Sequence, residues 1–170
     1  MQKDLNMNPT VKRGLKILGG IIATLVVIYI ICLIIFLVGT NPRTKAEKST
    51  ERIAIQKTPI TKIDENYHLS RDINSYSVLG RDKKGKQYYF IYLPKSKKSY
   101  LYSSKDGISK EKVLKLFNTQ YPEYKHPQIE LGWYKDSPVW EVTYKKSNGN
   151  YGYVIYSFKS GEKLSYIDNL

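Results

Sequence analysis

The strongest pattern in the chain is an uninterrupted apolar run over residues 17–38, which covers 22 positions without a charged side chain. As a helix with a rise of about 1.5 Å per residue, this run would be roughly 33 Å long, enough to cross a hydrocarbon core of about 30 Å. A surface helix of a soluble protein would alternate between apolar and polar faces, and this run does not. The pattern therefore predicts a transmembrane helix over residues 17–39.

The length and surroundings of the run predict an uncleaved anchor. The apolar part of a secretory signal is about 7 to 15 residues long and ends at small residues, and no such site follows here. Cys32 lies inside the run after Ile31, where a lipoprotein signal needs a small residue, so we expect it to pack or to face lipid. Both flanks are basic, but long domains cross regardless of charge. We expect residues 1–16 in the cytoplasm and the rest outside, in a single-pass protein of the cell membrane.

The part of the chain after residue 40 is strongly basic and contains no cysteine. It carries 24 Lys and Arg against 14 Asp and Glu, a net charge of +10 out of +13 for the whole chain. Such a surface favours anionic neighbours, such as lipid head groups, wall polymers or acidic proteins. The anchor separates this part from nucleic acid, so no nucleic-acid binding is expected. The absence of disulfides fits a bacterial envelope better than a eukaryotic exterior.

An internal repeat organises the part after the anchor. A shift of 64 residues gives nine identities over residues 72–102, where this composition would give about two by chance. The identities include three turns, with Asp72 matching Asp136 and Gly85 matching Gly149. A copy of about 65 residues has a marginal core by itself. We therefore expect two copies of one supersecondary unit that pack on each other, over residues 40–106 and 107–170.

Each copy predicts one helix followed by four antiparallel strands. In the second copy Ser109 caps a helix that Pro122 ends, and strands follow at residues 127–134, 138–145, 150–157 and 163–168. In the first copy a helix over residues 43–57 ends before Pro59, and strands follow at residues 60–68, 74–81, 86–93 and 98–104. One helix packed on a four-stranded antiparallel sheet, twice, is an α+β architecture.

The side-chain faces depend on the turn at Asn148 and Gly149. A two-residue turn would set Tyr144 opposite Tyr153 and would place Trp140 on the face that meets the helix. The opposite face would then be apolar too, and either the sister copy, a partner protein or water must cover it. A slip of one residue would exchange the faces. The predicted candidate interaction surface, from both copies, is Tyr88, Phe90, Tyr92, Val154, Tyr156 and Phe158.

The sequence offers no pattern typical of catalysis. The two histidines, His68 and His126, have no cysteine outside the membrane to join them in a metal site. Asp64 and Glu65 are adjacent strand residues, so they point to opposite faces and make poor catalytic partners. We expect no catalytic, metal or cofactor-binding residues and no enzymatic activity.

The layout and several motifs resemble the YpmB/TseB-like proteins of Gram-positive bacteria. The matching motifs are residues 80–85 (GRDKKG) with Tyr88 and Tyr89, residues 106–109 (DGIS), residues 139–144 (VWEVTY), residues 153–158, and Ser160 with Gly161. The resemblance implies PepSY-like, cystatin-like domains and a regulator of cell-wall elongation that contacts a penicillin-binding protein. Two alternatives remain open: a binder of anionic wall polymers, and an inhibitor or chaperone of an exported protease.

Overall fold

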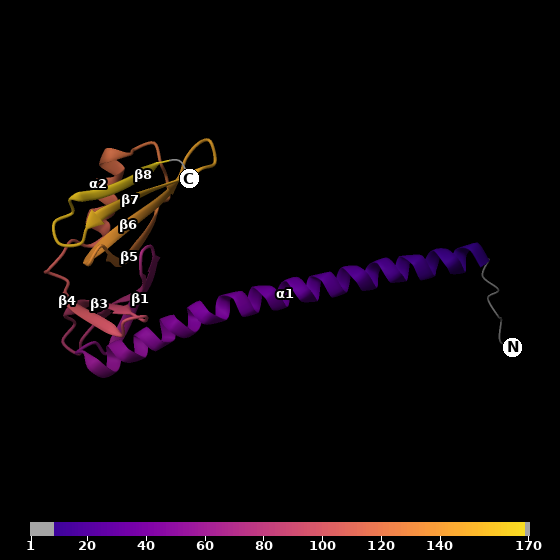
Figure 1. The fold of residues 1–170 in the computed structure, drawn as a ribbon, viewed down its shortest axis with the longest axis horizontal. Coiled ribbons are helices and arrows are strands. Elements are labelled where there is room, and N and C mark those ends of the chain that lie inside the picture. The colour runs from indigo at the N-terminus through magenta and orange to yellow at the C-terminus, as the bar shows by residue number, and fades with distance from the viewer. Residues whose placement is uncertain (1–8, 169–170) are drawn as a thin grey trace. The chain divides into compact units, whose positions relative to one another are not determined.

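A computed structural model describes residues 9–168, without the side chains at positions 9, 12, 38–42 and 168. The chain divides into two compact parts, which meet between Thr44 and Lys45. The N-terminal part contains most of helix α1 (Pro9–Lys57), drawn in indigo and purple in Figure 1. Within it, Arg13–Leu37 is long and apolar enough to cross a membrane, by length and composition. Residues 1–8 of the predicted tail lie outside the described residues.

Helix α1 also supplies the helix of the first copy. The sequence predicts two helices, at residues 17–39 and 43–57, and the structure has one continuous helix through both ranges. Its C-terminal end at Lys57 is the predicted one. Thr50 and Ala54 lie one turn apart on the buried face of this segment, and Thr50 Oγ1 donates to the Ala46 carbonyl.

The C-terminal part contains two four-stranded antiparallel sheets and helix α2 (Lys110–Gln120), and the α+β prediction is confirmed (Figure 1). Both sheets are simple meanders, with strand orders β1-β2-β3-β4 and β5-β6-β7-β8. The strands of the first sheet are β1 (Lys62–Ser70), β2 (Asn74–Arg81), β3 (Gln87–Leu93) and β4 (Lys98–Ser103). Those of the second sheet are β5 (Gln128–Tyr134), β6 (Ser137–Lys145), β7 (Tyr151–Ser157) and β8 (Lys163–Asp168).

The 64-residue shift maps β2, β3 and β4 onto β6, β7 and β8 to within one residue at each end. The repeat in the sequence is thus a repeat in the fold. The boundary predicted between residues 106 and 107 stays a prediction, because both sheets belong to one compact part.

The predicted register of the second hairpin is wrong by one residue. Tyr144 pairs with Gly152 and Val142 with Val154. Lys146 N donates to the Asn150 carbonyl across the hairpin, which leaves a loop of three residues that ends at Gly149 with φ +90°. A three-residue loop of this kind closes on a residue in the left-handed region, and glycine adopts that conformation at low cost.

The true register sets which residues each helix covers. Val113 and Phe117 of α2 belong to the same buried cluster as Trp140, Val142 and Tyr156. The helix-facing position predicted for Trp140 is consistent with its complete burial, and its indole N–H donates to the Ile108 carbonyl at 2.9 Å. In the first sheet, Val78 and Phe90 pack in the same way with Ala54 of α1.

The two sheets meet where β5, an edge strand, lies on the face of the first sheet that α1 does not cover. Two buried serines of β2 supply partners for the β5 backbone: Ser77 Oγ donates to the Leu131 carbonyl at 3.0 Å, and Trp133 N donates to Ser75 Oγ at 3.0 Å. Such groups would otherwise be buried without hydrogen bonds. Gly132, between them, lies so close that a Cβ atom would come within 2.3 Å of Leu69 Cβ.

The first copy also covers part of the second face of the second sheet. Leu69 of β1 packs there with Val139 and Ile155. Arg71, in the β1–β2 turn, forms an ion pair with the buried Glu141, and its guanidinium lies 4.2 Å from the centre of the Tyr153 ring. The sequence left three candidates for covering the second sheet face: the sister copy, a partner protein or water. These contacts show that the sister copy covers it.

The close approach at Gly132 predicts that Gly132→Ala destabilises the C-terminal part by roughly 1–3 kcal/mol, because the added methyl group must push β5 off the first sheet. Urea unfolding followed by the fluorescence of Trp133 and Trp140 would measure it. The matched control is Gly85→Asn, at a turn with φ +81° and open space around the Cβ position, which asparagine tolerates. Equal losses for the two variants would contradict the packing of β5 described above.

Candidate interaction surface

Most of the candidate surface predicted from the sequence lies in the core. Phe90 is 2% exposed, and Val154, Tyr156 and Phe158 are completely buried. The corrected register explains this for the second sheet, because it turns these three residues toward α2, where the Tyr156 hydroxyl donates to Gln120 Oε1 at 3.2 Å. These four residues cannot form an exposed surface, so the prediction that they belong to the interaction surface is wrong.

Tyr88 and Tyr92 are half-buried and remain available. They lie on the α1-facing side of the first sheet, where the cluster of Ala54, Val78 and Phe90 forms the core. Leu101 of β4 pairs with Phe90 and therefore shares this side, yet it is 40% exposed. We call Tyr88, Tyr92 and Leu101 the open strip. It is the part of this face beside β4 that helix α1 leaves accessible.

Leu101 is absent from the surface predicted from the sequence, although the sequence held a signal for it. The alternation of Tyr100, Leu101 and Tyr102 along β4 turns the tyrosines to the opposite face, where Tyr100 stacks on Trp133 with ring centres 4.0 Å apart. The remaining apolar residue must then face away from the second copy. Knowing this requires the packing of the two copies, which the alternation alone does not give.

The open strip borders a free sheet edge. In the described residues β4 is the last strand of the first sheet, whereas the opposite edge strand, β1, lies against the second copy. His68 N of β1, for example, donates to Glu130 Oε2 of β5 at 2.9 Å. A free edge can pair with an extended segment of another protein, and exposed side chains beside it add specificity.

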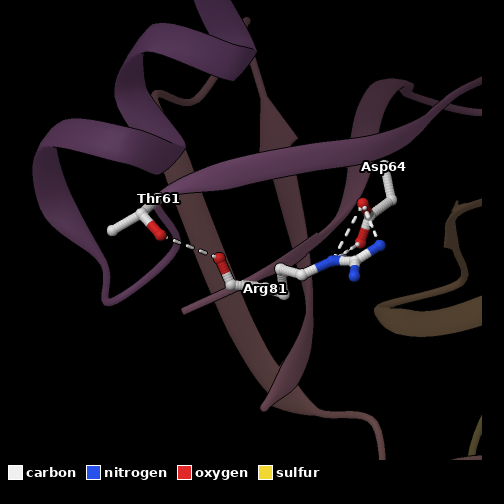
Figure 2. A network of polar contacts seen from close by, with 3 residues as sticks. All are labelled: Thr61, Asp64 and Arg81. Carbon is white, nitrogen blue, oxygen red and sulfur yellow. Dashed lines mark hydrogen bonds and ion pairs between the residues drawn. The ribbon is translucent and has the colours of Figure 1, made fainter. Parts of the chain in front are cut away.

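A network of charged and polar groups holds the start of β1 in a fixed position. At the start of β1 a bulge turns Asp64 toward Arg81, whose Nε and Nη2 donate to the carboxylate at 2.7–3.1 Å (Figure 2). The hydrogen bonds from Arg81 lower the pKa of Asp64. The Thr61 hydroxyl donates to the Arg81 carbonyl, which ties the start of β1 to the end of β2. This network is structural in character.

Metal-ligating side chains are not clustered in the described part of the chain. It contains no group of three or more His, Cys, Asp or Glu side chains placed to hold a metal ion. His68 stacks on Tyr76 with ring centres 4.5 Å apart, whereas His126 is exposed in the loop after α2.

Comparisons with known proteins support the fold. No family model matches the chain. It is 29% identical over 116 residues to the "Probable cell wall elongation regulator TseB" of Bacillus subtilis (strain 168), covering 67% of this chain and 71% of the relative. The solved structure of the YpmB protein from Bacillus subtilis matches with a TM-score of 0.60 and 25% identity, over 71% of this chain and 94% of that one. The resemblance to the YpmB/TseB-like family is confirmed.

The core of this YpmB/TseB-like fold contains tyrosines that cannot ionise easily. Burial raises the pKa of Tyr89 to about 12 and that of Tyr156 to about 12. Burial also raises the pKa of Tyr67, and the nearby Glu65 carboxylate raises it further. Tyr67 and Tyr89 both pack edge-on against Trp140, at 5.5 and 5.7 Å between ring centres. The junction between the copies therefore depends on neutral tyrosines.

These shifts predict that the fold loses stability in alkali. The unfolded chain ionises its tyrosines near pH 10, so their contribution is intact below pH 10 and is lost as the pH rises toward 12. Between these values each such tyrosine should remove about 1.4 kcal/mol per pH unit from the free energy of unfolding. Urea unfolding at a series of pH values would measure the slope. Tyr156→Phe should make it shallower, and the exposed Tyr151→Phe should not; an unchanged slope in Tyr156→Phe would refute the assignment.

Proposed function

We propose that the chain is a membrane-anchored, non-enzymatic regulator of cell-wall elongation that acts by contact with a membrane protein of wall synthesis, a penicillin-binding protein. The name of the relative in Bacillus subtilis suggests the regulatory role. The observation that carries the contact mechanism is the open strip, an apolar and aromatic surface beside a free sheet edge. A contact regulator requires such a surface and no acid, base or nucleophile.

The anchor would support this role physically. Arg13–Leu37 can cross a membrane, and in our proposal it is an uncleaved single span with the N-terminus in the cytoplasm. Confinement to the membrane raises the effective concentration of a partner in the same bilayer, so a weak contact becomes sufficient. Regulation by a small surface is then reasonable.

The open strip has the features of a binding centre. Aromatic residues and arginine dominate the energetics of protein contacts, and tyrosine contributes both an apolar ring and a hydroxyl. The Tyr88 hydroxyl donates to Asp82 Oδ2 at 3.4 Å, and Lys86 Nζ lies 5.0 Å from the centre of its ring. The ring is therefore held in place before a partner arrives, which lowers the entropic cost of binding.

The first test uses a photo-crosslinking amino acid at Ser99, which is exposed and pairs with Tyr92. In living cells the full chain should capture a penicillin-binding protein. Leu101→Glu should reduce capture about tenfold or more, because a carboxylate on the strip must be desolvated on binding. Mass spectrometry of the captured species and quantitative blotting give the measurement.

Leu164→Glu is the matched control for this test. Leu164 is 48% exposed on β8, the free edge of the second sheet, so the same change is made on a comparable strand. It should leave capture intact. Two results would reject the open strip as the partner surface. Either Leu101→Glu leaves capture unchanged, or Leu101→Glu and Leu164→Glu weaken capture equally.

The second test concerns topology. Protease added to intact, wall-stripped cells should remove the chain beyond about residue 42 and spare a tag on the N-terminus. The expectation follows from the positive-inside rule for the short tail. Blotting for tags at both ends would measure it, with detergent-treated cells as the control for protease access. Protection of a C-terminal tag in intact cells would overturn the proposed orientation.

A further inference from the structure

The basic surface of the C-terminal part follows from its excess of lysine and arginine over aspartate and glutamate. Many carboxylates serve as internal partners: Glu51 for Asn66, Asp64 for Arg81, Glu65 for Lys110, Asp106 for the backbone of Ser103, Glu130 for the backbone of His68 and Glu141 for Arg71. Most lysines lie on exposed turns and strand ends. The excess positive charge is therefore presented to solvent.

Three lysines come together around one hollow at the end of the second sheet. The hollow lies between the loop after α2 and the β6–β7 hairpin, and its lining residues are Glu123, Tyr124, Lys125, Lys145, Lys146 and Ser147. Glu123 is the one carboxylate in this lining. A second hollow shares Tyr124 and Lys125 and is also lined by Leu114 and Asn118 of α2 and by His126 of the following loop. Tyr124 lines both hollows, as a ridge between them, and we call these two adjoining hollows the lysine hollow.

The walls of the lysine hollow are rigid. The Tyr124 ring stacks on Tyr144, whose side chain is buried, at 4.4 Å and 23° between ring planes. Lys125 Nζ donates to the Pro122 carbonyl at 2.7 Å, which closes the loop on itself. Tyr121 stacks on Tyr144 as well, so several rings of one aromatic cluster support the ridge. A preformed site binds with little loss of conformational entropy.

The charge and shape of the depression fit a polymer better than a single ion. Lys125 lines the hollow from the loop after α2, and Lys145 and Lys146 line it from the β6–β7 hairpin, so an extended anion reaches more of this charge than a single ion does. The second hollow extends the binding surface beyond the lysines along α2. Tyr151, 47% exposed, pairs with Lys145 across the hairpin and offers an aromatic surface beside the charges. Repeating anionic groups joined by polyol or sugar units match this alternation of lysines and rings.

We propose that the lysine hollow is a binding site for a polyol-phosphate polymer, an anionic component of the wall. The choice of a wall polymer rests on the proposed location of this part outside the membrane. The site is separate from the open strip, since the two lie on different sheets. In this proposal the chain has one surface for a protein and another for an anionic polymer of the wall.

The test uses the full chain in nanodiscs of phosphatidylcholine, which carry no net charge, and fluorescent poly(glycerol phosphate) as the probe. Fluorescence anisotropy should show binding that weakens with salt. The triple variant Lys125→Gln, Lys145→Gln and Lys146→Gln should bind at least tenfold more weakly, whereas the corresponding Lys→Arg variant should keep its affinity. The matched control removes the same charge from the β3–β4 turn, with Lys95→Gln, Lys97→Gln and Lys98→Gln, and should change the affinity less than about twofold.

Several results would overturn the proposal. Equal losses in the two triple Lys→Gln variants would show that net charge alone binds the polymer. If polyglutamate of the same length binds as tightly, the site does not select for phosphate. If phosphatidylglycerol vesicles compete equally per phosphate, the site does not select for a polymer. Each variant must have the same melting curve as the unmodified chain, measured by tryptophan fluorescence, which shows that it folds. None of these outcomes touches partner capture through Leu101, so failure here is distinguishable from failure of the proposed function.

Discussion

The fold depends on the contact between the edge of β5 and the face of the first sheet. An edge strand presents unpaired peptide groups, and burying them without partners would cost more than the apolar contacts return. Ser75 and Ser77 supply those partners, and Gly132 lets the backbone approach closely enough for the hydroxyls to reach it. The two copies, each marginal alone, thereby obtain a shared core in which Trp140 and Trp133 pack with residues of the first sheet.

This contact decides which surfaces remain for function. It buries one face of the first sheet and the edges of β1 and β5, while the helices bury the core face of each sheet. What stays accessible is the margin of the first sheet beside β4 and the ends of the second sheet. The open strip and the lysine hollow lie in these two places. Both proposed sites are therefore what the duplicated architecture leaves exposed.

Local patterns in the sequence were sufficient for the elements and their repeat. Turn residues, caps and periodicity located both helical segments and all eight strands, and burial of Trp140 followed from its strand. The register did not follow, because a loop of two residues and a loop of three residues are both compatible with Asn148 and Gly149, and the choice exchanges the faces. The bonds of Ser77 to Leu131 and of Arg71 to Glu141 join positions 54 and 70 residues apart, so no local pattern could reveal them. The predicted candidate surface was wrong because of the hairpin register. Leu101 was not predicted because its exposure depends on the long-range contacts between the copies.

The placement of charge is the last consequence of the duplication. In the junction between the copies Glu130 accepts from a backbone N–H, whereas Glu141 and Glu65 pair with Arg71 and Lys110, so the lysine excess of the sequence remains at the surface. A basic surface is commonly explained by solubility, and that explanation requires no particular arrangement. Three lysines that line one hollow beside a stacked aromatic cluster form a local arrangement, which solubility alone does not require. The specific position of these lysines, and not the net charge of the chain, is what argues for a defined anionic ligand.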